Sequence, residues 1–414
     1  MSQLARQMKM VDIEPDVEDT WNNLGDSTVM QKYQAAAAFT NGNPLPLVAT
    51  LFSTPLFPYI EALRLVLSQC QTGASLAQLC RIGDDHIMKH AAKVFVKGNI
   101  ERGIAFPTCI CVNGVVANCS PLSDEADEAR LAIGDVVKVE LGAHVDGYAA
   151  TAAHTIVIAE DSSKPVTGRK ADVLAAAYLA AEAAVRLIKV GADSRDVWHT
   201  INEVAQAFRV APVEGTASHL LKRFLLEADQ AIPNSFDPAA PNDFTFGENE
   251  VISINIVFST GTGSNAIESP YHSSTLLQRD VNAAQGFKLK SSRATFNHVV
   301  RTFGVYPFST RALLDMDTQH RLGLPELLKS GVLVSRPVYI EENETDIVAQ
   351  FKITVALLPK GQGTFRLTAP LNPPYVHSTK SVDSRIEKLV KQDVKVARAK
   401  APASSSNETG MDLS

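Results

Sequence analysis

The chain has 414 residues, a net charge of −6 and 45% hydrophobic residues, a globular composition with room for two ordinary domains or one large one. The negative charge argues against a protein that coats nucleic acid over its whole surface, but it allows a local basic patch. No apolar stretch reaches the roughly 18–20 residues of a membrane span, and the N-terminus lacks the apolar core of a signal peptide. We therefore expect a soluble, intracellular protein that does not enter membranes.

The cysteines are odd in number and include no C-x-x-C pair; they are Cys70, Cys80, Cys109, Cys111 and Cys119. This usage favours free thiols in a reducing compartment over a disulfide framework. Cys109 and Cys111 would share a face of a strand, but no matching Cys or His accompanies them. Buried structural thiols are therefore the preferred interpretation, ahead of metal ligands.

The N-terminal region, residues 1–58, is predicted to be an arm with an atypical insertion. Residues 1–30 are acidic and lack periodicity, which predicts a mobile arm. The stretch 37–57 mixes Ala-rich, Pro-rich and apolar pieces without a single period, so we expect it to pack poorly. Helices are predicted next over 60–67 and 75–94, from their apolar spacing.

A strand, a turn at Asn113-Gly114 and a second strand are predicted over 103–121, because Asn-Gly between β-rich runs is the strongest short hairpin signal. The stretch 133–158, IGDVVKVELGAHVDGYAATAAHTIVI, is predicted to be a hairpin at the centre of the sheet. Glu140 ends its first β-branched run and points toward the core. A buried carboxylate needs a partner, a proton or a metal, so the surroundings of Glu140 bear directly on function.

The rest of the chain alternates between helical and strand patterns. Helices are predicted over 173–187, 196–210, 295–303 and 313–322, and strands over 213–223, 250–258, 332–340 and 347–358. The region before the last strand is expected to be a small helical insertion with a terminal hairpin. Strands and helices thus follow an α+β rather than a βαβ rhythm.

Several motifs carry a resemblance to a known fold. They are GIAFPT (103–108), VVKVELGAHVDGY (136–148), AHT (153–155), EG with SH (214–219) and VAQFKITV (348–355). Together they resemble the pita-bread fold of methionine aminopeptidases and creatinases over roughly 60–374. The insertion after Gly263 resembles that of the type II aminopeptidase branch. VDGY, AHT and SHL resemble the proliferation-associated, ErbB-receptor-binding protein family, whose fungal relatives are described as curved-DNA-binding and which lacks peptidase activity.

The resemblance implies a division of the chain. The aminopeptidase-like domain would comprise 59–275 and 345–376, the helical insert 276–344, and a basic, then disordered tail 377–414. Compared with the family, about twenty residues are extra between the N-terminal arm and the helix at 60–67, more than a usual connection. The stretch 37–57 is therefore either a lineage-specific loop or a gene-model artefact.

Aminopeptidases of this fold hold two divalent metals with two Asp, one His and two Glu, which neutralise the metals and poise a bridging hydroxide. The resemblance places these five positions on Glu140, Thr151, His219, Asn255 and Lys352. The two histidines that orient substrate in the family fall on Asn118 and Glu227. Most of these positions are altered, so we expect no metal, no cofactor and a pseudo-peptidase. Lys352 would neutralise Glu140 if the two meet across the sheet.

These residues allow other interpretations. His144 and His154 lie near the central hairpin, but no tetrahedral set for zinc forms around them in the sequence. Lys352 as a nucleophile of lowered pKa has no evident partner base. A working methionine aminopeptidase is the alternative function, and it would demand two equivalents of metal. A metal-free, creatinase-like hydrolase would need a His base aligned with two Glu, which the pocket positions lack.

The function that the resemblance implies is non-catalytic. Such a protein would be a monomer in the cytoplasm and nucleus, binding the ribosome or structured RNA or DNA in growth control or ribosome biogenesis, with protein partners left open. The candidate nucleic-acid contacts are Lys288, Lys290 and Arg293 in the insertion and Lys388, Lys391, Lys395, Arg398 and Lys400 in the tail. Asp383, Glu387 and Asp393 interrupt the tail, so a solvated helix end is its competing interpretation.

Overall fold

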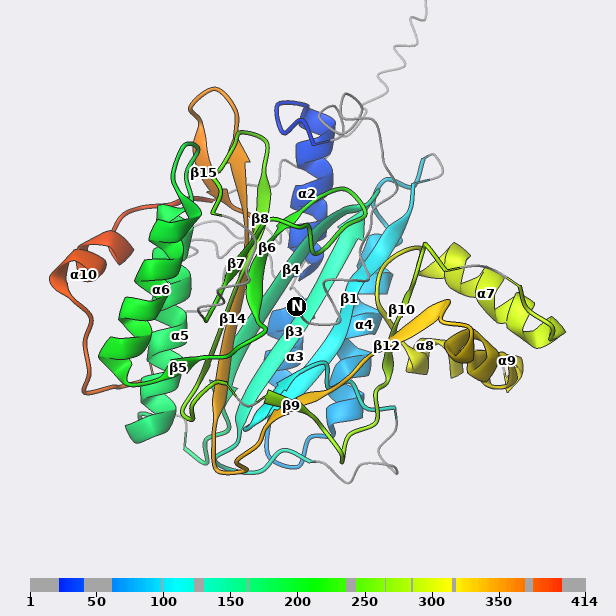
Figure 1. The fold of residues 1–414 in the computed structure, drawn as a ribbon, viewed down its shortest axis with the longest axis horizontal. Helices are drawn as coiled ribbons and strands as arrows, with labels where there is room; N and C mark the ends of the chain where they lie inside the picture. The colour runs from blue at the N-terminus through cyan, green and yellow to red at the C-terminus, as the bar shows by residue number, and fades with distance from the viewer. Residues whose placement is uncertain are drawn as a thin grey trace, which may run out of the picture.

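The computed structural model describes residues 22–40, 62–97, 100–122, 130–161, 164–235, 243–264, 266–283, 286–314, 318–368 and 375–396. Its main sheet runs in the order β1-β3-β4-β14-β8-β6-β7 (Figure 1), and three short strands extend it: β15 pairs with β14, β16 with β15, and β5 with β8. The path strands are β1 (Arg102–Val112), β3 (Val136–Val145), β4 (Tyr148–Val157), β14 (Val348–Leu358), β8 (Val251–Ser259), β6 (Ala217–Leu221) and β7 (Ala231–Pro233). The attached strands are β5 (Ala211–Pro212), β15 (Gly363–Arg366) and β16 (Lys395–Val396).

The predicted central hairpin is present as β3 and β4, paired in register from Val136↔Val157 to Val145↔Tyr148. Its turn is Asp146-Gly147, and both residues have positive φ (55° and 81°), as the favoured two-residue hairpin turns require. The strands are longer than the β-branched runs suggested. Glu140 therefore lies in the middle of β3 rather than at its end, because small residues such as Gly142 and Ala143 continue the strand.

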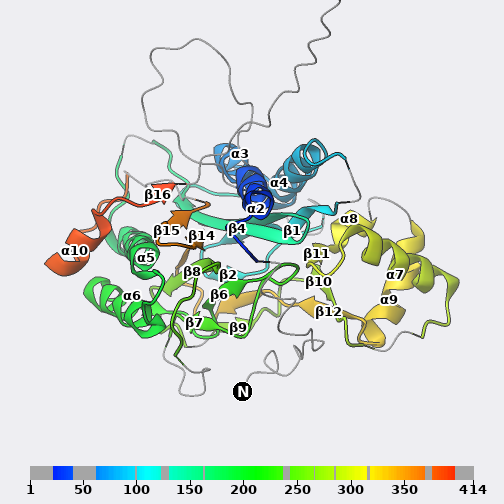
Figure 2. The ribbon, with the colours of Figure 1, turned by 90° about the horizontal axis from the view of Figure 1, so that it is seen from above.

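Helices cover one face of the sheet (Figure 2). Val137, Val139 and Leu141 of β3 pack in a core with α2 (Ser27–Thr40), α3 (Ala62–Gln69) and α4 (Leu76–Ala91). Phe351 and Ile353 of β14 pack in a second core with α5 (Gly168–Leu187) and α6 (Ser194–Phe208). Because successive strand residues alternate between faces, Glu140 and Lys352 point to the face opposite the helices.

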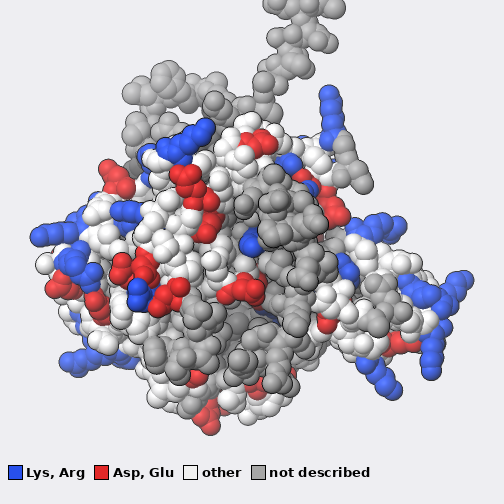
Figure 3. Space-filling model, turned by 45° about the horizontal axis from the view of Figure 1, so that its top comes forward, with Lys and Arg blue, Asp and Glu red and all other residues white. Residues whose placement is uncertain are grey.

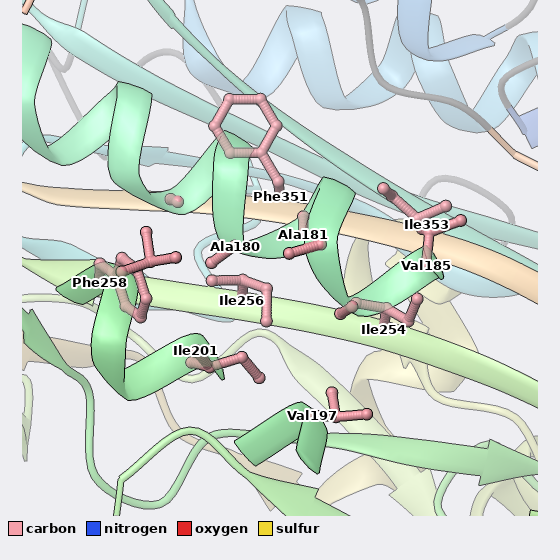
Figure 4. Close-up of a cluster of buried hydrophobic side chains, with 14 of the residues drawn as sticks. Ala180, Ala181, Val185, Val197, Ile201, Ile254, Ile256, Phe258, Phe351 and Ile353 are labelled. Atoms are coloured by element: carbon pink, nitrogen blue, oxygen red, sulfur yellow. The ribbon is translucent and has the colours of Figure 1, made fainter. Parts of the chain in front are cut away.

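The Ala-rich sequence of α5 explains the close approach of this helix to the sheet. Ala180 and Ala181 are fully buried and lie against Ile254, Ile256 and Phe351 (Figure 4). Side chains without bulk on the helix let the large β-branched and aromatic side chains of the strands fill the space between the layers.

The helix α2 corrects two expectations about the N-terminal region. It begins at Ser27, inside the predicted mobile arm, and continues through Ala37–Thr40, where poor packing was expected. Ala37, Phe39 and Thr40 are buried, and the Thr40 hydroxyl accepts a hydrogen bond from the Ala143 amide at 3.1 Å. The small side chains of the QAAAAF run therefore lie on the sheet. Residues 1–21 and 41–61, including most of the atypical insertion, lie outside the described residues.

The turn at Asn113-Gly114 exists, but the predicted hairpin around it was wrong. Asn113 has φ 49°, yet β1 pairs with β3. The following strand β2 (Val115–Ala117) pairs instead with β13 (Tyr339–Glu341), which also pairs with β9 (Ala266–Glu268) in a separate three-stranded sheet. The Asn-Gly signal is local, and the tertiary pairing of both flanking strands overrides it.

The insert is built on its own three-stranded sheet, in the order β11-β10-β12. Its elements are β10 (Leu276–Arg279), α7 (Lys290–Thr302), β11 (Phe308–Ser309), α8 (Thr310–Leu314), α9 (Thr318–Lys329) and β12 (Leu333–Arg336). No terminal hairpin forms between the described strands, since β12 pairs with β10 while β13 pairs elsewhere. The single helix predicted over 313–322 is two helices, α8 and α9.

The tail packs on the body as far as it is described. After α10 (Ser384–Val390), strand β16 pairs with β15 in parallel. Arg398 and Lys400 lie outside the described residues. Among the described helices, none is both long and apolar enough to cross a membrane.

Candidate functional site

A single row of paired residues crosses the helix-free face of the sheet. Glu140 of β3 pairs with Ala153 of β4, Ala153 with Lys352 of β14, and Lys352 with Asn255 of β8. Directly opposed residues point to the same face. Because Ala153 has only a methyl group, the longer side chains of Glu140 and Lys352 meet above it.

Both oxygens of the Glu140 carboxylate have partners. The Lys352 ammonium forms an ion pair with Oε1. The Gln350 side-chain amide donates to Oε2 at 2.9 Å and also to Oδ1 of Asn255 at 2.9 Å. With 9% of its side chain exposed, Glu140 obtains in this way the charge and hydrogen-bond compensation that a buried carboxylate needs.

Thr151 and His219 lie beside this group without entering it. The Thr151 hydroxyl shares a 2.8 Å hydrogen bond with Ser253, the strand partner of His219. Burial lowers the pKa of His219, and the nearby Lys352 cation adds to the effect while Glu227 opposes it. The imidazole is therefore neutral near pH 7, and its Nδ1 atom is buried without a hydrogen-bond partner among the described residues.

A second ion pair joins Glu227 to Arg336 of the insert strand β12, at 2.5 Å. Burial alone would raise the pKa of Glu227, but the Arg336 guanidinium and His219 lower it to about 2. The centroid of the Phe106 ring lies 5.6 Å from the Lys352 ammonium and 5.9 Å from the Arg336 guanidinium. Both cations therefore lie beside one aromatic ring, and each is paired with a carboxylate.

Arg336 was missed by the sequence analysis. In the sequence Arg336 is a single arginine at the end of a short strand, 109 residues from its partner Glu227. Nothing else in the sequence indicates its role. Asn118, predicted to take the place of a substrate histidine, instead donates to the Pro337 carbonyl at 2.9 Å. This bond fixes the chain that directly follows Arg336.

Comparison with known proteins decides the family. The model of metallopeptidase family M24 matches residues 60–272. A relative in Dictyostelium discoideum, proliferation-associated protein A, is 38% identical over 349 residues, covering 83% of this chain and 88% of that protein. The chain belongs to metallopeptidase family M24.

Two further matches refine this placement in M24. The curved DNA-binding protein of Schizosaccharomyces pombe is 33% identical over 346 residues, 82% of this chain and 88% of that protein. The solved structure of a thermophilic Arx1 superposes with a TM-score of 0.76 at 22% identity, covering 89% of this chain and 99% of the other. The predicted α+β, pita-bread fold and the resemblance to the proliferation-associated branch are both confirmed.

The metals that the M24 family name implies do not fit the residues of this site. Of the five expected ligand positions, Glu140 is the one carboxylate, and an ammonium already neutralises it. His219 lies on β6, next to the strand of Asn255, and pairs with Ser253. The Thr151 hydroxyl is hydrogen-bonded to the Ser253 hydroxyl. Within the described ranges, no group of three or more His, Cys, Asp or Glu side chains could hold a metal ion. Two dications need an excess of carboxylates that this M24 member does not supply.

The two histidines of the central hairpin do not form a metal site either. Since β-strand residues alternate, His144 lies on the face of Glu140, where its ring is tilted against that of Tyr306 with the two centroids 4.3 Å apart. His154 lies on the helix face, edge-on to Phe351, with a centroid distance of 5.1 Å. Burial lowers their pKa values to about 4 and about 3. Each is a neutral, packed side chain near pH 7.

The candidate nucleic-acid contacts lie at opposite ends of the molecule. Lys288, Lys290 and Arg293 are exposed at the start of α7, whereas Lys388 and Lys391 lie on and after α10, on the far side of the sheet (Figures 1 and 2). In the tail, the Lys395 ammonium donates to the Gln362 carbonyl at 2.6 Å. The insert carries three further exposed cations that sequence reasoning missed, namely Arg301, Arg321 and Lys329.

Proposed function

We propose that this M24 member is a non-catalytic protein that acts by binding. The observation that carries the proposal is the ion pair between Lys352 and Glu140, in the row that holds three of the five expected ligand positions. A dication at this position would have to displace a tethered ammonium, and it would then face the oxygens of Asn255 and Gln350 instead of carboxylates. Neutral amide oxygens compensate a dication far less well than carboxylates do.

We propose structured nucleic acid, such as ribosomal RNA or duplex DNA, as the binding partner. The exposed Lys288, Lys290 and Arg293 at the start of α7 support this, and Figure 3 shows Lys and Arg side chains gathered over the insert. The name of the S. pombe relative describes DNA binding by that protein. A monomer present in both cytoplasm and nucleus, acting in growth control or ribosome biogenesis, is the setting that we propose for this activity.

Binding is tested with labelled duplex RNA and duplex DNA titrated with the full-length protein at several salt concentrations. Each phosphate contact contributes about 0.9 to the slope of log K against log salt. The variant K288E/K290E/R293E is therefore expected to bind more weakly, with a slope smaller by about 2–3. The matched control K388E/K391E/K395E reverses three exposed cations at the other end of the molecule and is expected to change binding less. Absent or salt-independent binding by the wild-type protein would count against the proposal.

Catalytic inactivity is tested separately with Met-initiated peptides and added Mn²⁺ or Co²⁺. We expect no release of methionine by the wild-type protein. The variant T151D/N255E/K352E places carboxylates at three of the five expected ligand positions, and it tests whether the residues at these positions prevent metal binding. Metal-dependent release of methionine by the wild-type protein would overturn the non-catalytic assignment and would leave the binding result standing.

A further inference from the structure

The insert exposes apolar as well as cationic side chains. Of the eleven large hydrophobic side chains that are exposed in the described residues, five lie in the insert: Val281, Leu289, Val300, Leu322 and Leu328. Leu322 is 70% exposed, second only to Tyr271 in that set. Phosphate groups bind cationic and hydrogen-bonding side chains and not leucines. Nucleic-acid binding therefore does not explain why this apolar surface is exposed.

The packing of α9 on α7 determines which side of α9 faces outward. Gly323 has the Ser291 backbone and the Thr295 side chain so close that a Cβ atom would lie 2.5–2.7 Å from them, and the Ser292 hydroxyl donates to the Gly323 carbonyl at 3.2 Å. Leu327, one turn later, is buried in the core of the insert. The inner side of α9 is therefore fixed against α7.

The outer side of α9 consists of the residues between these contacts. Leu322, Pro325 and Leu328 recur at the three-residue spacing that places side chains along one face of a helix, and all three are exposed. Arg321 and Lys329 lie on the same side. We call these five residues the α9 face.

The charges of the α9 face are available to a partner. Arg321 and Lys329 are exposed and form no ion pair with any residue of the part of the chain that the structure describes. The acid of this helix, Glu326, is engaged elsewhere, because its carboxylate accepts the backbone N–H groups of Lys288 and Leu289 at 2.8 and 3.1 Å. The face is therefore an apolar row bordered by cations.

We propose that the α9 face binds an acidic amphipathic helix of a protein partner. The apolar side of that helix would cover Leu322, Pro325 and Leu328, as in helix recognition through anchors at i, i+3 and i+7 spacing. Its carboxylates would meet Arg321 and Lys329, and complementary charge fixes the orientation. A second copy of this chain is a poor occupant, since two α9 faces would oppose cation to cation. The inference goes beyond the proposed nucleic-acid binding, which rests on α7.

The test uses a fluorescein-labelled synthetic helix with leucines on one side and glutamates on the other, titrated with the full-length protein and followed by anisotropy. The wild-type protein is expected to bind it, and L322S/L328S to bind at least about tenfold more weakly. The control V96S/I133S changes two similarly exposed side chains on the main domain and is expected to bind like the wild type. R321E/K329E is expected to lose affinity for this peptide, the Glu peptide. It is expected to gain affinity for a second peptide that has lysines in place of the glutamates.

Three results would overturn the proposal. The first is that the wild-type protein does not bind the Glu peptide, and the second is that L322S/L328S and V96S/I133S lose affinity for the peptide equally. The third is that L322S/L328S loses affinity for duplex RNA and keeps its affinity for the peptide. The last would make the α9 face part of the nucleic-acid surface. K288E/K290E/R293E keeps the two proposals separate, because it alters α7 and leaves the apolar row of α9 intact.

Discussion

Around Phe106, Glu140 and Glu227 each face a cation, whereas the cations of α7 and α9 extend into solvent beside exposed leucines. The first region lies where aminopeptidases of this fold do their chemistry, yet its charges neutralise one another. The second has the unpaired charge and exposed apolar surface that typify interaction sites. This difference is the basis of our proposal that the insert is the binding region of the protein and that the Glu140–Lys352 face stabilises the fold.

The largest effect is expected when Lys352 is replaced by methionine, which removes the cation and leaves the buried Glu140 carboxylate without its counter-ion. Breaking one side of a buried ion pair costs about 3–5 kcal/mol of unfolding free energy. Urea denaturation measures this loss, and E140Q/K352M is the control that should recover most of it. A loss below about 1 kcal/mol would show that the pair contributes little to stability.

A smaller effect is expected from acid, through Glu227. Its folded pKa of about 2 lies below its ordinary value of 4.5. A depressed carboxyl pKa contributes stability that is present above pH 4.5 and is lost as the pH falls toward 2. We expect this contribution to be about 2 kcal/mol, less than the full linkage value because 29% of the side chain is exposed. In R336Q the dependence of unfolding free energy on pH between 4.5 and 2 should flatten, and an unchanged profile would contradict the assignment.

The contact between α2 and the sheet provides a third test. T40V keeps the shape of the side chain but removes the acceptor of the Ala143 amide. An unpaired buried N–H group costs about 1–3 kcal/mol of unfolding free energy, so the midpoint temperature of thermal unfolding should fall. The exposed S68A, in α3, is a matched removal of a hydroxyl and should leave the midpoint nearly unchanged. Equal midpoints for T40V and the wild type would mean that α2 does not depend on this bond.

The smallest effect on stability is expected in the insert. L322S/L328S alters exposed side chains, and surface substitutions of this kind usually change the unfolding free energy by less than about 0.5 kcal/mol. Denaturant unfolding of this variant should overlay that of the wild type. A loss of more than about 1 kcal/mol would mean that the α9 face is part of the packing of the insert, and the contrast between the two regions would weaken.

Much of the fold could be predicted from the sequence, because alternation in β3, β4 and β14 and the motif resemblance point to the same sheet. The contacts between side chains of the site were harder to predict from the sequence. Glu140 and Lys352 are 212 residues apart, so only the resemblance placed them in one row. Arg336 had no such guide, since its partner Glu227 is known only once β12 is placed. The helix α2 was missed because an Ala-rich run has no amphipathic period, and the Asn113-Gly114 hairpin failed because its strands prefer distant partners.

The central claim is that the Lys352 ammonium has taken over the neutralising role of the metals. Equilibrium dialysis of the full-length protein against Mn²⁺, Co²⁺ or Zn²⁺, followed by elemental analysis, tests it most directly. The account predicts no metal above the dialysis background in the wild-type protein and detectable uptake in T151D/N255E/K352E. Two metal ions per wild-type chain, as in a working site of this family, would contradict it.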